Sequence, residues 1–244
     1  MPQHHTHWLD NAQSPIAIIG AMQPEIALLR TWLRDPREHT FGGTQIFCGW
    51  LDGQAVALMQ GGIGKVNASI GTTLLIQHFG ARAIINTGSA GGLAPQLAVG
   101  DVVIADNAAH HDVDVTAFGY QRGQMAQMPL YYPCDSALIA HATHASSAFS
   151  QAKVHRGLVV SGDSFIASAK QRTQILTDFP KALAVEMEAA AIAQTCYQFN
   201  TPFAIVRAIS DTADSDASHS FEEFITLAGK HSAEMVRQIV QHID

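Results

Sequence analysis

The acidic residue Asp211 stands where a carboxyl group could donate a proton to a bound molecule. It directly follows FAIVRAIS, an apolar run typical of a buried strand. A carboxyl group that leaves such a strand for a crevice is partly desolvated, which raises its pKa and lets it act as an acid near neutral pH. The alternative is a helix N-cap, because the polar stretch TADSDASHS follows and precedes the final helix. Position alone leaves the two interpretations equally open.

Glu25, Glu186 and Glu188 are further candidates for acid–base chemistry. Glu186 and Glu188 flank Met187 in AVEMEAAAIA. If a strand passes into a helix there, one carboxylate can face a crevice while the other caps the helix or faces solvent. Glu25 lies in the expected first turn of another helix. Taken singly, each glutamate is explained as well by an acid that complements the positive end of a helix dipole.

Two glycine-rich segments and one histidine–aspartate segment resemble ligand sites less closely. TGSAGG at 87–92 has neither the GxGxxG spacing of a dinucleotide fold nor the GK[ST] ending of a P-loop, and GGIGK at 61–65 is too short. We expect tight turns with close backbone packing at both. In HHDVD at 110–114 successive side chains alternate faces, and no second ligand cluster has metal spacing. We therefore predict no metal site.

Short apolar runs predict the strands that position these residues. Strands are expected at 15–20, 45–50, 54–60, 83–87, 101–105, 156–161 and 203–209. The dipeptide Asp52-Gly53 predicts a hairpin between the second and the third of them. Helices are expected after the first strand with Pro24 in the first turn, over 65–79 with Gly80 closing it, over 135–149, and at the C-terminus.

Strands that are apolar on both faces and alternate with amphipathic helices predict an α/β fold. We expect a single domain with a mixed or mostly parallel central sheet, covered by helices on both faces. Ligands in such folds bind at the carboxyl ends of the strands. The segments expected at those ends are 20–22, 87–89, 161–163 and 210–211. They should converge on one crevice.

Composition narrows the class of protein. Of 244 residues, 47% are hydrophobic and 14% charged, as in a globular protein. The net charge of −7 and the scattered lysines and arginines argue against a nucleic-acid partner. No apolar run is long enough to span a membrane. Residues 1–14 are polar, contain His4, His5 and His7, and lack the features of a signal peptide. We expect them to be a mobile extension before a domain over 15–244. Three widely spaced cysteines indicate reduced thiols and a cytoplasmic location.

Seven segments occur in one order over nearly the whole chain: IAIIGAMQPEIALL, GGIGKVNA, IINTGSAGGL, DVTAFGY, SGDSFI, AVEMEAAAIA and VRAISDTAD. Together they resemble the 5′-methylthioadenosine/S-adenosylhomocysteine nucleosidases of the nucleoside phosphorylase-like superfamily. EMEA followed by ISD is specific to that superfamily, and GAM with a nearby Glu narrows the resemblance to the nucleosidases. It implies a three-layer sandwich and a hydrolase of methionine salvage that needs no cofactor. The substrates would be methylthioadenosine and S-adenosylhomocysteine, with 5′-deoxyadenosine as a further candidate.

The resemblance also implies roles for particular residues. Asp211 would protonate or hydrogen-bond N7 of adenine, and Glu25 would position and activate the attacking water with Ser89 and Arg207. Glu188 would hold the ribose hydroxyls. The other expected contacts are Met187 against the sugar, Phe165 stacked on adenine, the Ile166 backbone at the edge of the base, an apolar pocket of Met22, Ile63 and Phe221 for the 5′-alkylthio group, and Phe118 supplied by the partner in a homodimer.

Two positions depart from the family pattern, and two other functions stay open. Gln23-Pro24 stands where the family often has acids, and Ala126 lies near a proline of some relatives. The alternatives are a phosphate-dependent phosphorylase of the same superfamily and a catalytically silent nucleoside-binding protein. Glu25 would repel phosphate at close range, which favours hydrolysis. The apolar residues expected at the 5′ position favour a thioether over a phosphorylated or futalosine-type substrate.

Overall fold

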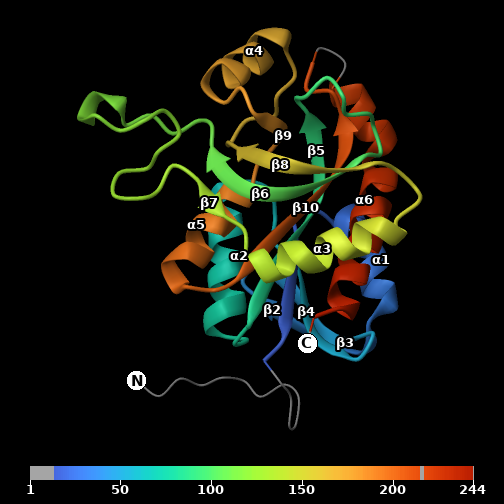
Figure 1. Cartoon of the computed structure of the whole chain (residues 1–244). Helices are drawn as coiled ribbons and strands as arrows, with labels where there is room; N and C mark the ends of the chain where they lie inside the picture. Colours follow the sequence, from blue (N-terminus) through green and yellow to red (C-terminus); the bar gives the residue numbers. More distant parts are fainter. Residues whose placement is uncertain (1–13, 215–216, 244) are drawn as a thin grey trace.

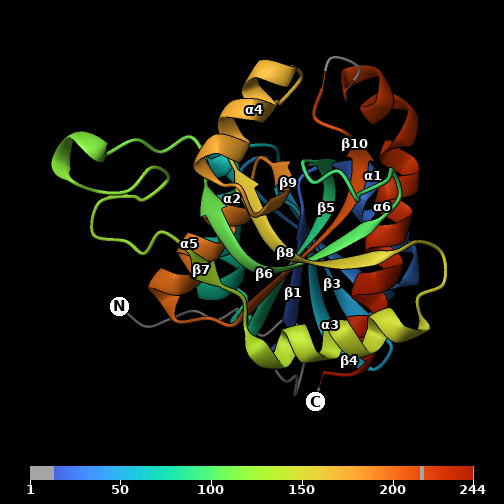
Figure 2. The ribbon, with the colours of Figure 1, turned by 45° about the horizontal axis from the view of Figure 1, so that its top comes forward.

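In the computed structural model, which describes residues 14–214 and 217–243, a mixed sheet lies between two layers of helices (Figure 1). The predicted extension at 1–14 therefore lies outside the described residues apart from Ser14. One layer contains α1 (Gln23–Trp32), α3 (Ser136–Ala148) and α6 (Ala217–Gln241), and the other contains α2 (Lys65–Gln77) and α5 (Ala189–Phe199) (Figure 2). Helix α4 (Ala169–Asp178) lies near one end of the sheet. This arrangement confirms the predicted three-layer α/β fold.

Ten strands form the sheet within the described residues. They are β1 (Ile16–Gly20), β2 (Arg34–Phe41), β3 (Thr44–Leu51), β4 (Gln54–Gln60), β5 (Ala83–Gly92), β6 (Val102–His110), β7 (Tyr132–Pro133), β8 (Val154–Ser161), β9 (Ala182–Glu186) and β10 (Phe203–Asp211). Their order is β10-β6-β8-β9-β5-β1-β4-β3-β2, with β7 beside β6. Because β10 also pairs with β5, the strands from β10 to β5 close into a ring.

The pairings bring the ends of several strands to one place. β5 runs parallel to β1 and β10. β5 and β9 are antiparallel but pair only at their carboxyl ends, through Gly91 with Val185 and Gly92 with Ala184. β8 runs parallel to β9, and Ser161 lies opposite Glu186 at the last position of both strands. The carboxyl ends of β5, β8, β9 and β10 are thereby grouped, as the α/β pattern predicted.

Both faces of the sheet are buried because the strands are apolar on both sides. Ile16 and Ile18 of β1 pack into the core beneath α1 and α6, whereas Ala17 and Ile19 point to the core beneath α2. The predicted apolar face of the C-terminal helix is also buried, at Ala228, Met235, Val236, Ile239 and Val240. Within the described residues no helix has the length and apolar character needed to cross a membrane.

The glycine-rich segment 87–92 was wrongly predicted as a turn. It continues β5 to Gly92. A Cβ at Gly91 would lie 2.8 Å from Asp211 Oδ1, so the glycine serves the close approach of two strands. One boundary also differs from expectation, because α2 ends at Gln77. Pro24, the second residue of α1, lies in the first turn as predicted. The predicted hairpin at Asp52-Gly53 is confirmed, with φ of 49° and 91° at its two turn residues.

Candidate active site

A pocket of about 350 Å³ lies where the carboxyl ends of β5, β9 and β10 meet the segments after β1, β4 and β8. Such a volume suits a drug-sized small molecule. Of the residues predicted to form the site, all but Arg207 and Phe118 line it. These are Met22, Glu25, Ile63, Ser89, Phe165, Ile166, Met187, Glu188, Asp211 and Phe221.

Glu25 is fixed at the start of α1 by four hydrogen-bond donors. Its carboxylate reaches back so that Oε2 accepts the N–H groups of Ala21 and Met22 at 2.8 and 3.0 Å. Oε1 accepts both the N–H and the hydroxyl of Ser89, each at 2.9 Å. The side chain is buried, with Glu25 only 1% exposed. A carboxylate offers about four lone-pair sites, so these donors fill it. Only the Ser89 hydroxyl can rotate away and admit another donor.

Asp211 is the last residue of β10 and is 3% exposed. Burial raises the pKa of its carboxyl group, while hydrogen bonds from the Ala213 N–H and the Ser210 hydroxyl oppose that rise. These bonds are 2.8 and 2.9 Å long. The alternative of a helix N-cap is wrong, because Asp211 belongs to β10 while α6 begins at Ala217. Asp211 is thus a buried acid that is protonated at higher pH than an exposed aspartate.

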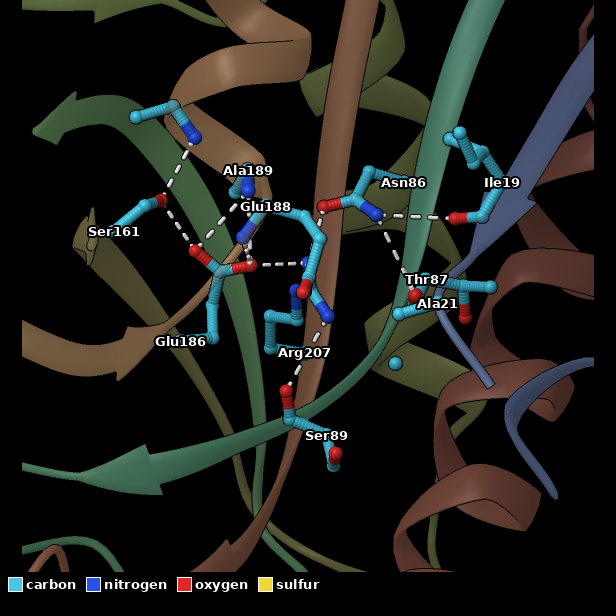
Figure 3. Close-up of polar contacts among 12 residues, drawn as sticks. Ile19, Ala21, Asn86, Thr87, Ser89, Ser161, Glu186, Glu188, Ala189 and Arg207 are labelled. Atoms are coloured by element: carbon cyan, nitrogen blue, oxygen red, sulfur yellow. Dashed lines mark hydrogen bonds and ion pairs between the residues drawn. The ribbon is translucent and has the colours of Figure 1, made fainter. Parts of the chain in front are cut away.

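The two glutamates around Met187 point in different directions, as the alternation predicted. Glu186 accepts the N–H groups of Glu188 and Ala189 at the start of α5, and it accepts the hydroxyl of Ser161 (Figure 3). It is the acid at the helix dipole. Glu188 turns toward the pocket, where its Oε1 accepts the N–H of Gly64 at 2.9 Å. Burial first, and the neighbouring Glu186 second, raise the pKa of Glu188 to about 8.

Arg207 lies behind the pocket wall and not among the lining residues. It is 1% exposed and forms an ion pair with Glu186 (Figure 3). Its Nη2 donates to Asn86 Oδ1 at 2.6 Å, and its Nη1 donates to the backbone oxygen of Ser89 at 3.3 Å. Arg207 also lies 3.5 Å from Glu188. One buried cation thereby fixes two carboxylates and the strand segment that carries Ser89.

Sequence reasoning left Glu186 and Asn86 out of the site. Glu186 was considered only as one of a pair, and the pattern gave no means to say which member faces the pocket. Asn86 interrupts the apolar strand segment AIINT with a polar residue, which is the one signal that could have marked it. Its amide donates to the backbone oxygen of Ile19 at 3.0 Å while its oxygen accepts from Arg207. Glu186 lines the pocket and pairs with Arg207, whereas Asn86 is a supporting residue beneath the pocket.

The outer part of the pocket is apolar. Phe165 and Phe221 lie edge to face with ring centroids 5.7 Å apart, and Phe165 remains 42% exposed. Ile63 is 50% exposed beside them. Phe118 stands elsewhere, in the short 3₁₀ helix Thr116–Phe118, and is 82% exposed. The segment between β6 and β7 that carries it extends away from the rest of the chain (Figure 1).

The histidine–aspartate segment after β6 takes part in no metal cluster. Asp112 accepts two hydrogen bonds from the Lys65 ammonium, at 2.7 and 2.8 Å. Among the described residues, no three His, Cys, Asp or Glu side chains are grouped so that they could hold a metal ion. The ionisable side chains that line the pocket are carboxylic acids: Glu25, Glu186, Glu188 and Asp211.

Comparison with known proteins gives consistent results. The sequence pattern of the Phosphorylase superfamily matches residues 15–241. A curated 5′-methylthioadenosine/S-adenosylhomocysteine nucleosidase from Marinomonas sp. (strain MWYL1) is 46% identical over 228 residues, which are 93% of this chain and 99% of that protein. The nucleosidase of the same name from Neisseria meningitidis, solved with methylthio-immucillin-A, is 49% identical with a TM-score of 0.93, covering 95% of this chain and 100% of its own. Futalosine hydrolase of Helicobacter pylori strain 26695 is 30% identical with a TM-score of 0.90, covering 94% and 98%.

Proposed function

Because the chain belongs to the 5′-methylthioadenosine/S-adenosylhomocysteine nucleosidases of the phosphorylase superfamily, we propose that it hydrolyses the N-glycosidic bond of these two nucleosides to release adenine. The observation that carries hydrolysis is the charge of the pocket. Its ionisable lining residues are Glu25, Glu186, Glu188 and Asp211, and no lysine or arginine lines it within the described chain. A phosphate nucleophile would be repelled there, whereas a neutral water would not.

Asp211 acts on the adenine base. A proton given to N7 draws electrons away from the bond between C1′ and N9, so adenine leaves as a neutral molecule. The buried position of Asp211 supports this role, because the raised pKa of its carboxyl group keeps the proton available at higher pH. Its hydrogen bond from the Ala213 N–H fixes the orientation of the carboxyl group.

Glu25 and Ser89 act on the water. The three backbone donors at Glu25 are immobile, so an attacking water reaches the carboxylate where the Ser89 hydroxyl turns aside. That hydroxyl can then bond the water itself, which places the nucleophile between the two residues. Glu25 takes the proton as the oxygen bonds to C1′. Arg207 supports this arrangement from behind by holding the backbone oxygen of Ser89.

Glu188 and Met187 hold the ribose. As the bond to adenine breaks, positive charge develops at C1′ and the ring oxygen, and carboxylates nearby stabilise it. Glu188 has one oxygen on the Gly64 N–H, which leaves the rest of the carboxyl group for the ribose hydroxyls. Its proximity to Arg207 favours the ionised form during this step. Met187 lines the same pocket, where its side chain and backbone would lie against the sugar.

Phe165 and Ile166 recognise adenine, and the apolar end of the pocket selects the 5′ group. The Phe165 ring provides a stacking surface, and the Ile166 backbone reads the edge of the base. Met22, Ile63 and Phe221 then line the space for an alkylthio substituent. A phosphate attached directly at the 5′ oxygen would lose its hydration there without a cationic partner among the lining residues. This chemistry favours thioether nucleosides, with 5′-deoxyadenosine as a further substrate, over futalosine.

We further propose that the chain acts as a homodimer in which Phe118 of each protomer closes the pocket of the other. Exposed apolar side chains support an interface on this side: Ile63, at the pocket, is followed along the start of α2 by Val66 and Ile70, which are 70% and 53% exposed. The Phe118 side chain of the same chain is 82% exposed.

We propose that residues 15–244 act as one domain in the cytoplasm, in methionine salvage. The three free, buried cysteines fit a reducing compartment.

A substrate series tests this function. We expect adenine release from methylthioadenosine and S-adenosylhomocysteine, followed by absorbance, with kcat/KM at least about 100-fold above that for adenosine 5′-monophosphate and futalosine, because an uncompensated charge at the apolar end costs several kcal/mol. Comparable cleavage of the phosphorylated nucleoside would refute the assignment of the 5′ pocket. If neither methylthioadenosine nor S-adenosylhomocysteine released adenine, the proposed function itself would be refuted.

A further inference from the structure

Lys65, Asp112 and Asp163 form a closed cluster at the edge of the pocket, which we call the charged cluster. The Lys65 ammonium donates to both oxygens of Asp112, at 2.7 and 2.8 Å. Asp112 Oδ2 also accepts the N–H of Asp163 at 3.0 Å. Asp163 Oδ1 in turn accepts the backbone N–H of Lys65 at 2.8 Å. Each member thus bonds both others, and none of the three lines the pocket.

The charged cluster joins three segments that are far apart in the sequence. Lys65 is the first residue of α2, Asp112 follows β6, and Asp163 follows β8. β6 and β8 are parallel neighbours whose last residues, His110 and Ser161, are paired, which brings the two aspartates together. The anionic Asp163 lies at the N-terminus of α2, where the helix dipole favours a negative charge.

The segments joined in this way carry the groups assigned to the sugar and to the base. Gly64, directly before Lys65, donates its N–H to Glu188 Oε1 at 2.9 Å. Gly64 has a φ of 94°, and a Cβ at this position would lie only 3.1 Å from Asp163 Oδ1. Glycine is therefore the residue that allows α2 and Asp163 to approach this closely. On the other side, Asp163 is followed within the same loop by Phe165 and Ile166. Asp163 therefore links the residue that orients Glu188 to the residues that face adenine.

We propose that the charged cluster is a positioning device, in which Asp163 holds the sugar-binding and base-binding segments in their bound arrangement before the nucleoside enters. This inference rests on the proposed function for its substrate, and it concerns residues that do not touch the substrate. Lys65 and Asp112 serve to fix Asp163: the Asp112 side chain is 28% exposed, that of Lys65 19%, and that of Asp163 50%. A substitution of Asp163 removes its bond to the α2 N-terminus and its 3.9 Å ion pair with the Lys65 ammonium, and it leaves the Lys65–Asp112 ion pair in place.

Loss of that link affects binding more than chemistry. If the two segments move independently in the free enzyme, the nucleoside must order them when it binds. Both segments are ordered once the nucleoside is bound, and they stay ordered in the transition state. The free-energy cost of ordering them therefore raises KM and leaves kcat unaltered. A charge-assisted hydrogen bond of this kind corresponds to about a tenfold change in an equilibrium constant.

The test compares Asp163→Ala with Asp163→Asn, measured on the full chain with methylthioadenosine. Alanine removes the acceptor for the Lys65 N–H, whereas asparagine keeps an oxygen at that place. We expect about a tenfold higher KM for Asp163→Ala, a kcat within about twofold of wild type, and a substantial rescue of KM in Asp163→Asn. Asp106→Asn is the matched control, because it breaks an exposed ion pair of β6 with Arg156 that has no connection to the pocket. It should leave KM unchanged.

A second measurement shows the link directly. Amide hydrogen exchange at 61–66 should become faster in Asp163→Ala and stay as in wild type in Asp106→Asn. In a double-mutant cycle with Glu188→Gln, the two increases in KM should combine to less than their product, because both variants lose the same contact chain. A wild-type KM in Asp163→Ala, unchanged exchange at 61–66, or increases in KM that multiply would each overturn the inference. If wild type releases no adenine, the proposed function fails instead, and the exchange measurement alone decides whether Asp163 holds the segment.

Discussion

Replacing Asp211 with asparagine isolates proton donation from every other property of this side chain. Asparagine has the same shape, and its Oδ1 keeps the hydrogen bond from the Ala213 N–H that is 2.8 Å long in the wild type. The Ser210 hydroxyl, which donates to Asp211 Oδ2 at 2.9 Å, can rotate to accept from the asparagine NH₂ instead. We therefore expect Asp211→Asn to fold normally, with Tm within a few degrees of wild type, and to bind adenine within about tenfold of the wild-type affinity.

The rate of adenine release should nevertheless fall by about 10²- to 10⁴-fold in kcat/KM, which corresponds to about 2.7 to 5.5 kcal/mol on the barrier. The pH profile provides the second readout. A general acid works in its protonated form, so wild-type activity declines as the pH rises through the pKa of Asp211. Burial raises that pKa and moves the decline to higher pH than for an exposed aspartate. Asp211→Asn should lack this decline, because asparagine does not ionise.

The matched control is Asp214→Asn, which removes a nearby charge without touching the pocket. Because the charge of Asp214 contributes to the raised pKa of Asp211, the control should move the alkaline decline slightly to lower pH while keeping most of the activity. A kcat/KM for Asp211→Asn within about threefold of wild type would refute the role of Asp211 as the acid.

Three other substitutions test the packing and the charges around the pocket. In Gly88→Ala the new Cβ would lie 2.5 Å from Arg207 Nη1 and 2.6 Å from Glu25 Oε1, at a residue whose φ is 148°. We therefore expect the rate of adenine release to fall at least about 100-fold and Tm to drop. A wild-type rate would show that the Glu25 carboxylate can shift freely. The Tm of Glu188→Gln should exceed that of wild type by a margin that grows as the pH rises from 4.5 to about 8. Over that range the folded wild type holds a proton at Glu188 that the unfolded chain releases, so wild type loses stability. Adenine release should fall, and a Tm difference that does not change with pH would contradict the raised pKa of Glu188. His111→Gln should gain stability relative to wild type as the pH falls below 6.5, since burial lowers the pKa of His111 and protonation then favours the unfolded chain. Thermal unfolding of both proteins at several pH values measures this effect. Equal changes of Tm with pH in the two proteins would exclude it.

Much of the fold could be predicted because its strands are apolar on both faces. FAIVRAIS and PIAIIG each lie in one central strand, and their short length and β-branched residues favour a strand over a helix. β2 (Arg34–Phe41) could not be predicted, since its sequence RDPREHTF is charged and contains a proline. It is a largely exposed edge strand, where such residues are tolerated because only one side is paired. β5 was predicted too short for the opposite reason, as its glycines indicated a turn when they serve the approach of Asp211.

The candidate site divides in the same way. Asp211 could be placed at the crevice from the end of its predicted strand, whereas no strand was predicted before Glu188. The competing explanation of each residue as a helix acid could not be dismissed without the structure. Both Glu186 and Glu188 line the pocket, and Glu186 is the one that accepts the N–H groups at the start of α5, an assignment that depends on where β9 ends. Hydrogen bonds between distant segments, such as Lys65 with Asp112 and Asp163, leave no periodic trace in a sequence. Phe118 does not line the pocket of its own chain, and the role that we propose for it requires a second protomer.

The most direct test of hydrolysis is adenine release from methylthioadenosine in buffer free of phosphate and in buffer with phosphate, each in isotopically labelled water. We predict equal rates in the two buffers and incorporation of the labelled oxygen at C1′ of the sugar product, because in the proposed mechanism Glu25 directs a water to that carbon. Strict dependence on phosphate, with a sugar phosphate as product and no labelled oxygen at C1′, would contradict the account.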